Sequence, residues 1–119
     1  MEKVSIFEKF RTFDKYWQSR MVGEFNGQAV KLAKIRGDFE WHAHKMEDEL
    51  LLILKGKMVI QFEDKTVELV DGDLFVVPCG VEHQFIAVDE VQLLVIEPKS
   101  TLNAIMKKSE DSITVSQEK

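Results

Sequence analysis

Three histidines and one glutamate are the residues of this chain whose types and spacing suit metal chemistry. His42 and His44 are two apart in a segment that we expect to be extended, so their side chains point to the same side. Glu49 follows the mostly polar run 45–48, which can turn the chain. His83 comes soon after a Pro-x-Gly turn, which can return a distant strand to the same point. The chain has no further histidine, so all three belong to this pattern.

Three imidazoles and a carboxylate suit one borderline divalent ion: iron, manganese, nickel, copper or zinc. Zinc usually takes four ligands, so four protein ligands would close its site and favour a structural role. An octahedral ion with the same ligands would keep two positions for water, substrate or dioxygen. The sequence therefore predicts a metal site formed by His42, His44, Glu49 and His83, in which Glu49 is also the candidate catalytic base.

Short apolar runs separated by turn residues predict an all-β fold. Asn26-Gly27 lies between two segments that carry apolar residues and indicates a hairpin turn, because both residue types tolerate positive φ. Further turn signals separate runs rich in Val, Ile, Leu and Phe at 49–54, 58–62, 66–70, 73–77, 82–88 and 91–96. Many short strands with such regular turns are typical of a β-sandwich or barrel, not of βαβ units.

With 119 residues, the chain has room for one domain. We expect an N-terminal arm over 1–20, a barrel over 21–98, and a C-terminal turn and flexible tail over 99–119. The arm is expected to be a short helix or irregular, because aromatic and apolar side chains recur at spacings of three and four: Ile6, Phe7, Phe10, Phe13 and Trp17. A face docked on the core explains this pattern better than a ligand-binding aromatic box.

Strand alternation predicts which residues surround the metal. Phe85 lies on the side of His83, and Leu51 and Ile53 lie on the side of Glu49. We therefore expect Leu51, Ile53 and Phe85 to form a largely apolar pocket that suits a small, partly hydrophobic or planar molecule.

The same alternation over 30–33 indicates a half-buried strand. No ring of Lys or Arg lies in the segments that carry the candidate ligands, which counts against a phosphate-bearing substrate. Lys31, Lys34 and Arg36 would contribute to such a site only if they point inward.

Charge and cysteine content exclude some classes of protein. The net charge is −5 and no basic stripe is present, so we expect neither nucleic-acid nor membrane binding. Residues 1–20 lack the pattern of a signal peptide, and the single Cys79 allows no internal disulfide, so a cytoplasmic location is expected. Cys79 is interpreted as a small residue in a turn, and Glu47 and Asp48 as solvated charges.

The candidate ligands resemble the two motifs of the cupin family. The first motif is matched by Gly37, His42-x-His44, Glu49 and Gly56, and the second by Gly72, Pro78-x-Gly80 and His83. This resemblance covers about residues 28–98. It implies a conserved-barrel cupin, a double-stranded β-helix or jelly-roll of two antiparallel sheets. In that family the metal lies near the middle of the barrel, and its ligand positions correspond to His42, His44, Glu49 and His83.

Two functions from different classes are compatible with this pattern. The leading hypothesis is a metal-dependent enzyme, oxygenase-like, that acts on a small organic molecule. The alternative is a non-catalytic cupin module that binds or senses a small ligand; similar small cupins are also labelled sugar-phosphate isomerase-like. A homodimer is expected as well, because residues 50–54 are apolar on both strand faces and the aromatic arm could be covered by a partner.

Overall fold

Strands β1 (Arg20–Phe25) and β2 (Gln28–Asp38) are separated at the turn that the sequence predicts. In the first hairpin, Asn26 (φ 49°) and Gly27 (φ 78°) both have positive φ, and Phe25 is paired directly with Gln28. This is the backbone that a two-residue hairpin turn requires, and it explains why Asn-Gly occurs there. The predicted hairpin is confirmed.

The computed structural model describes residues 2–99. In chain order its elements are α1 (Ile6–Phe10), β1 (Arg20–Phe25), β2 (Gln28–Asp38), β3 (Glu49–Lys55), β4 (Lys57–Phe62), β5 (Thr66–Val70), β6 (Leu74–Val77) and β7 (His83–Pro98). The predicted C-terminal turn and tail lie, apart from Lys99, outside the described residues. No helix in the described part of the chain is long and apolar enough to cross a membrane.

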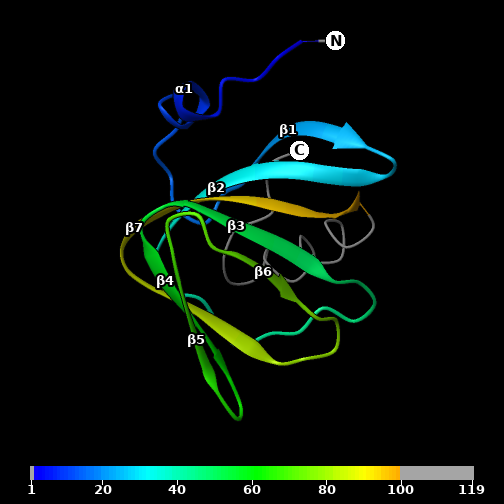
Figure 1. Cartoon of the computed structure of the whole chain (residues 1–119), viewed down its shortest axis with the longest axis vertical. Coiled ribbons are helices and arrows are strands. Elements are labelled where there is room, and N and C mark those ends of the chain that lie inside the picture. The colour runs from blue at the N-terminus through cyan, green and yellow to red at the C-terminus, as the bar shows by residue number, and fades with distance from the viewer. Residues whose placement is uncertain (1, 100–119) are drawn as a thin grey trace.

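All strand pairs among the described residues are antiparallel, and β7 connects the two layers of the barrel (Figure 1). Its first part pairs with β4, and β4 pairs in turn with β5. Its second part lies between β2 and β3 in the order β1-β2-β7-β3-β6. The predicted all-β barrel is confirmed.

One strand boundary was predicted wrongly. The runs 82–88 and 91–96 form the single strand β7, because β2 pairs with both parts of it and no turn interrupts the pairing. The pairing shifts register between Ile35 and Gly37, where Val88, Asp89 and Glu90 of β7 are exposed. The bend therefore occurs within a continuous strand.

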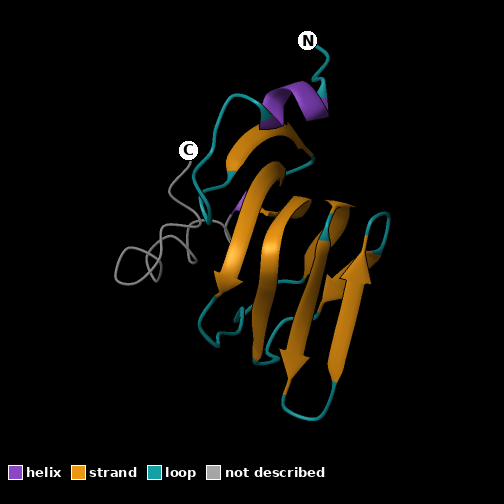
Figure 2. Ribbon diagram, turned by 90° about the vertical axis from the view of Figure 1, so that its left-hand side faces the viewer, coloured by secondary structure: helices purple, strands orange, loops and turns teal. Residues whose placement is uncertain are grey.

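Strand β2 is covered on both faces, so the half-buried strand expected over 30–33 is wrong. Ala33 and Ile35 belong to the barrel core, whereas Leu32 packs on the other face against Phe10 and Phe13. Those two aromatic residues come from the N-terminal arm, whose helix α1 lies on the outer side of the sheet (Figure 2). The arm therefore buries the Leu32 face of β2, whereas Lys31 and Ala33, which the alternation assigns to solvent, line the barrel cavity.

The aromatic residues of the arm have different surroundings. Phe10 and Phe13 are buried, whereas Phe7 is exposed. Trp17 has a positive φ of 64°, donates its backbone N–H to the Lys34 carbonyl, and stacks on Phe39 with 5.1 Å between ring centroids. The arm is docked through Phe10, Phe13 and Trp17, and Trp17 brings it to the barrel interior.

Candidate metal centre

His42 and His83 come from distant parts of the chain and pair directly. Each donates its backbone N–H to the carbonyl of the other, at 3.0 and 2.9 Å. This isolated antiparallel bridge places the two rings side by side, with 4.3 Å between their centroids. The predicted approach of His83 to the His42 segment therefore depends on backbone pairing at the first residue of β7.

Hydrogen bonds orient both of these rings. The Nδ1 atom of His42 lies 3.1 Å from the Glu40 carbonyl oxygen, and that of His83 lies 2.9 Å from the Val81 carbonyl oxygen. A carbonyl only accepts, so each Nδ1 carries the proton and each Nε2 carries the lone pair. Metal-binding histidines are commonly oriented by such a bond from the second ring nitrogen.

His44 completes a group of three buried histidines. Their ligand nitrogens all lie within 4.8 Å of one another. Two hydrogen bonds hold the loop of His44 against the turn before β7: Gly80 N–H donates to the His44 carbonyl at 2.6 Å, and Cys79 N–H donates to Asp48 Oδ1 at 2.9 Å. Asp48 is exposed, as predicted, but it also positions this turn.

Glu49 is the first residue of β3 and is buried beside His44. Its Oε1 lies 3.8 Å from His44 Nε2 and has no hydrogen-bond partner among the described residues. Glu49 forms a second possible metal-binding group with His44 and Glu97. Burial, followed by the nearby Glu97, raises the pKa of Glu49 well above its ordinary value, and Lys31 opposes this shift.

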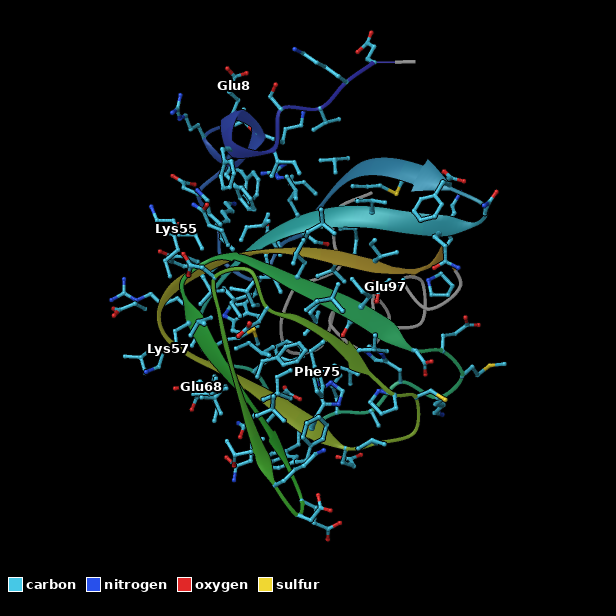
Figure 3. All side chains as sticks on the ribbon, in the orientation of Figure 1. Glu8, Lys55, Lys57, Glu68, Phe75 and Glu97 are labelled. Carbon is cyan, nitrogen blue, oxygen red and sulfur yellow. The ribbon has the colours of Figure 1, made fainter. Side chains whose placement is uncertain are left out.

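Glu97 and Lys31 belong to the site although the sequence motifs do not include them. Glu97 is fully buried, and its Oε2 lies 2.5 Å from the Nζ of Lys31, which is also buried. Figure 3 shows Glu97 within the outline of the barrel, whereas Lys55, Lys57 and Glu68 lie at its periphery. Strand alternation could have predicted that Glu97 points into the barrel, because Glu97 continues the buried series Val91, Leu93 and Val95 on β7.

A cavity of about 50 Å³ lies inside the barrel, and its polar lining includes Lys31, His42, His44, Glu49 and Glu97. Leu51 and Phe85 are part of its wall, as expected. Ile53 is not among the lining residues; it is fully buried in the core, one step further along β3 than Leu51. Trp17 also lines the cavity, so one aromatic residue of the arm does more than cover the core. Most of the remaining wall is apolar: Ala33, Ile35, Phe39, Leu93 and Val95.

The residues present fit a divalent first-row ion. Ligand atoms bound at about 2.1 Å lie within about 4.2 Å of one another, close to the spread of the three histidine nitrogens. The lone pairs of His42 and His83 are on Nε2, the ring nitrogens that do not contact the Glu40 and Val81 carbonyl oxygens. Glu49 adds a buried carboxylate oxygen that has no hydrogen bond from the described residues. This donor set suits iron, manganese, nickel, copper or zinc.

The cupin domain model matches residues 30–97, more than half of the chain, and this segment includes all three histidines and both glutamates of the site. The chain belongs to the cupin family. The predicted family is thus confirmed. The cupin is 32% identical over 87 residues to the uncharacterized protein YdbB of Bacillus subtilis (strain 168), covering 72% of this chain and 77% of YdbB.

Two solved structures share the fold of this cupin at higher coverage. A cupin-2 domain containing protein from Shewanella frigidimarina NCIMB 400 is 36% identical, with a TM-score of 0.79 over 80% of this chain and 93% of that one. Protein NMB1881 from Neisseria meningitidis is 28% identical, with a TM-score of 0.75 over 82% and 99% of the two chains. Both similarities extend beyond the matched domain model, which covers 30–97.

Proposed function

We propose that this cupin is a metal-dependent enzyme that acts on a small organic molecule held in the barrel cavity. One divalent ion (iron, manganese, nickel, copper or zinc) would be held by His42, His44, Glu49 and His83. The observation that carries the proposal is the group of three buried histidines, two of them oriented through Nδ1, beside a mostly apolar cavity whose wall includes His42 and His44.

An oxygenase-like reaction is the class we favour. When bound, a first-row ion supplies Lewis acidity and, for iron, manganese or copper, one-electron chemistry. The protein's own residues would do the rest. The carbonyl-bonded histidines keep their rings in the ligating tautomer. Glu49 is placed to hold or accept a proton at its carboxylate, and the apolar walls at Leu51 and Phe85 would exclude water and orient the substrate.

A non-catalytic module that binds a small ligand is the second candidate, favoured by the small volume of the cavity. A sugar-phosphate isomerase has less support. Among the described residues that line the cavity, Lys31 is the one basic residue, and it is already paired with Glu97. A phosphate would need further cationic groups to offset its charge on burial.

The metal content of the purified protein tests the first part of the proposal. We expect near-stoichiometric metal by mass spectrometry when the protein is prepared without chelator, and loss of that metal in His42→Ala. The control is Trp41→Ala, because this exposed neighbour points away from the site. Far-UV circular dichroism should show the same β content in all three proteins. A folded His42→Ala variant with full metal content would contradict the ligand assignment.

A turnover assay distinguishes the proposed enzyme from the alternative, a non-catalytic binding module. The metal-loaded protein should convert at least one compound of a panel of small organic acids, ketones and enols, followed by oxygen consumption and by mass spectrometry of the products. Ligand binding without conversion across that panel would favour the binding module instead.

A further inference from the structure

The proposed metal site leaves part of the cavity's polar lining without a role. Lys31 and Glu97 form an ion pair in the cavity wall, with side-chain exposures of 4% and 0%. The hydroxyl of Ser19, which lines the same cavity, is buried and has no hydrogen-bond partner among the described residues. Buried polar groups without partners are costly, so a hydrogen-bonding ligand would stabilise this region.

A count of charges indicates what the ligand carries. Among the described residues that line the cavity, the acidic and basic ones are Glu49, Glu97 and Lys31, and the histidines bind metal as neutral imidazoles. The Lys31–Glu97 pair sums to zero. A divalent ion with ionised Glu49 sums to +1, so the loaded cavity has one uncompensated positive charge. In a cavity with mostly apolar walls, this charge favours a ligand with a single negative charge.

The hydrogen-bond donors and the volume of the cavity indicate which polar groups the ligand carries and how large it is. An ammonium group has three N–H donors, and among the described residues Lys31 has Glu97 as its one ion-pair partner. Donors therefore remain on Lys31, in addition to the Ser19 hydroxyl. A volume of about 50 Å³ accommodates roughly four water-sized groups, since each needs about 10–15 Å³. The other walls are apolar and offer contacts to a short hydrocarbon group.

From these observations we infer that the cavity binds a small monocarboxylate, whose carboxylate accepts hydrogen bonds from Lys31 and Ser19 beside the metal centre. The inference rests on the proposed function and names the substrate class of the same site. Lys31 is then a specificity-determining residue, and Glu97 is a positioning residue that holds the Lys31 ammonium in the cavity wall.

The test compares propionate with its uncharged counterpart propionamide. Both are titrated into zinc-loaded protein and followed by ligand-observed NMR, which reads binding and not activity. We expect propionate to bind at least tenfold more tightly than propionamide. Equal binding of the two probes, or no binding of either, would overturn the inference.

Variants test whether Lys31 causes the preference for propionate over propionamide. Lys31→Met alone would leave Glu97 buried without its partner, so Lys31→Met/Glu97→Gln is the main variant, because it removes the pair and keeps the total charge. It should lose most of the preference for propionate, and its metal content is measured beside that of the wild type. The control is Lys34→Met, since Lys34 is buried on the same strand but its Nζ donates to the Phe13 carbonyl, away from the cavity.

The outcomes distinguish the two proposals. A wild-type protein that binds no metal overturns the proposed function and, with it, the charge argument. A protein that binds metal but shows the same preference for propionate in the wild type and the double variant overturns the role of Lys31 alone. A tenfold preference that is lost in the double variant and kept in Lys34→Met supports the inference.

Discussion

Burial in the folded protein favours a protonated Glu49, whereas metal binding favours an ionised Glu49. Burial and the nearby Glu97 raise the pKa of its carboxyl above the ordinary value of 4.5. Above about that pH the unfolded chain ionises Glu49, whereas the metal-free folded protein keeps the proton. The folded state then binds more protons, so its stability falls as pH rises from there until the raised pKa is reached. A bound divalent ion would remove this cost, because it favours the ionised carboxylate.

We predict that Glu49→Gln stabilises the metal-free protein at pH 8 and removes much of this loss of stability between pH 5 and pH 8. Metal affinity should fall on the order of 100-fold, because an amide is a weaker ligand than a carboxylate. Urea unfolding followed by tryptophan fluorescence, after removal of metal, measures the first effect, and calorimetric titration with zinc measures the second. Glu68→Gln is the control, since Glu68 is an exposed residue of β5. If the free energy of unfolding of Glu49→Gln fell between pH 5 and pH 8 as steeply as that of the wild type, the prediction would be wrong.

At the residue scale, the sequence predicted the site residues that lie close together in the chain. It did not predict those that the register of distant strands brings together. His42, His44 and Glu49 lie within one short segment, so alternation and one turn suffice to bring them near each other. Glu97 and Lys31 meet because Ala29 pairs with Glu97 and Lys31 with Val95, across β2 and β7. That register depends on contacts between residues far apart in the chain, which a local pattern does not contain.

At the scale of the elements, Gly56 fixes the connection between β3 and β4. It has a φ of +110° and lies against β7, so a Cβ there would be 2.8 Å from the Glu90 carbonyl oxygen and 3.1 Å from Val91 Cα. Its N–H also donates to Asp71 Oδ1 at 2.8 Å. The turn therefore needs glycine both for its backbone conformation and for its close packing against another strand.

We predict that Gly56→Ala lowers the free energy of unfolding by roughly 2–4 kcal/mol, from the positive φ and the backbone contact together. The control is Gly72→Ala. Gly72 also has a positive φ (+87°), but a Cβ added there would have no described atom within 4 Å, so a loss of about 1 kcal/mol is expected. Urea unfolding of both variants measures the difference. Equal losses would mean that conformation alone, and not packing against β7, explains the glycine.

The elements themselves were predictable where the signal is local. The Asn26-Gly27 turn carries its own conformational preference, and the predicted hairpin follows from it. The continuity of β7 through 88–90 was not predictable in this way, because it results from pairing with β2 on both sides of the bend. The burial of both faces of β2 likewise results from the docked arm, through Phe10 and Phe13.

At the scale of the whole molecule, one sheet face remains apolar and partly exposed. The pairs Leu50–Val76 and Leu52–Leu74 place four apolar side chains on the outer face of β3 and β6. Leu74 is 57% exposed and Val76 is 43% exposed, and β6 is the last strand in the sheet order. The buried residues of the aromatic arm, Phe10 and Phe13, pack on β2 within the same chain.

We propose that a second copy of the chain covers this face. The four side chains are all apolar, so the same patch on a second copy is complementary to it, as a two-fold interface requires. Light scattering after size exclusion should give twice the monomer mass of 13.8 kDa. Leu74→Glu should shift the protein to the monomer mass, because two copies would bury a carboxylate against apolar side chains. Val88→Glu should remain dimeric, since Val88 lies in the exposed bend of β7 and is 83% exposed. A wild-type protein of monomer mass, or a Leu74→Glu variant of dimer mass, would exclude this face as the interface.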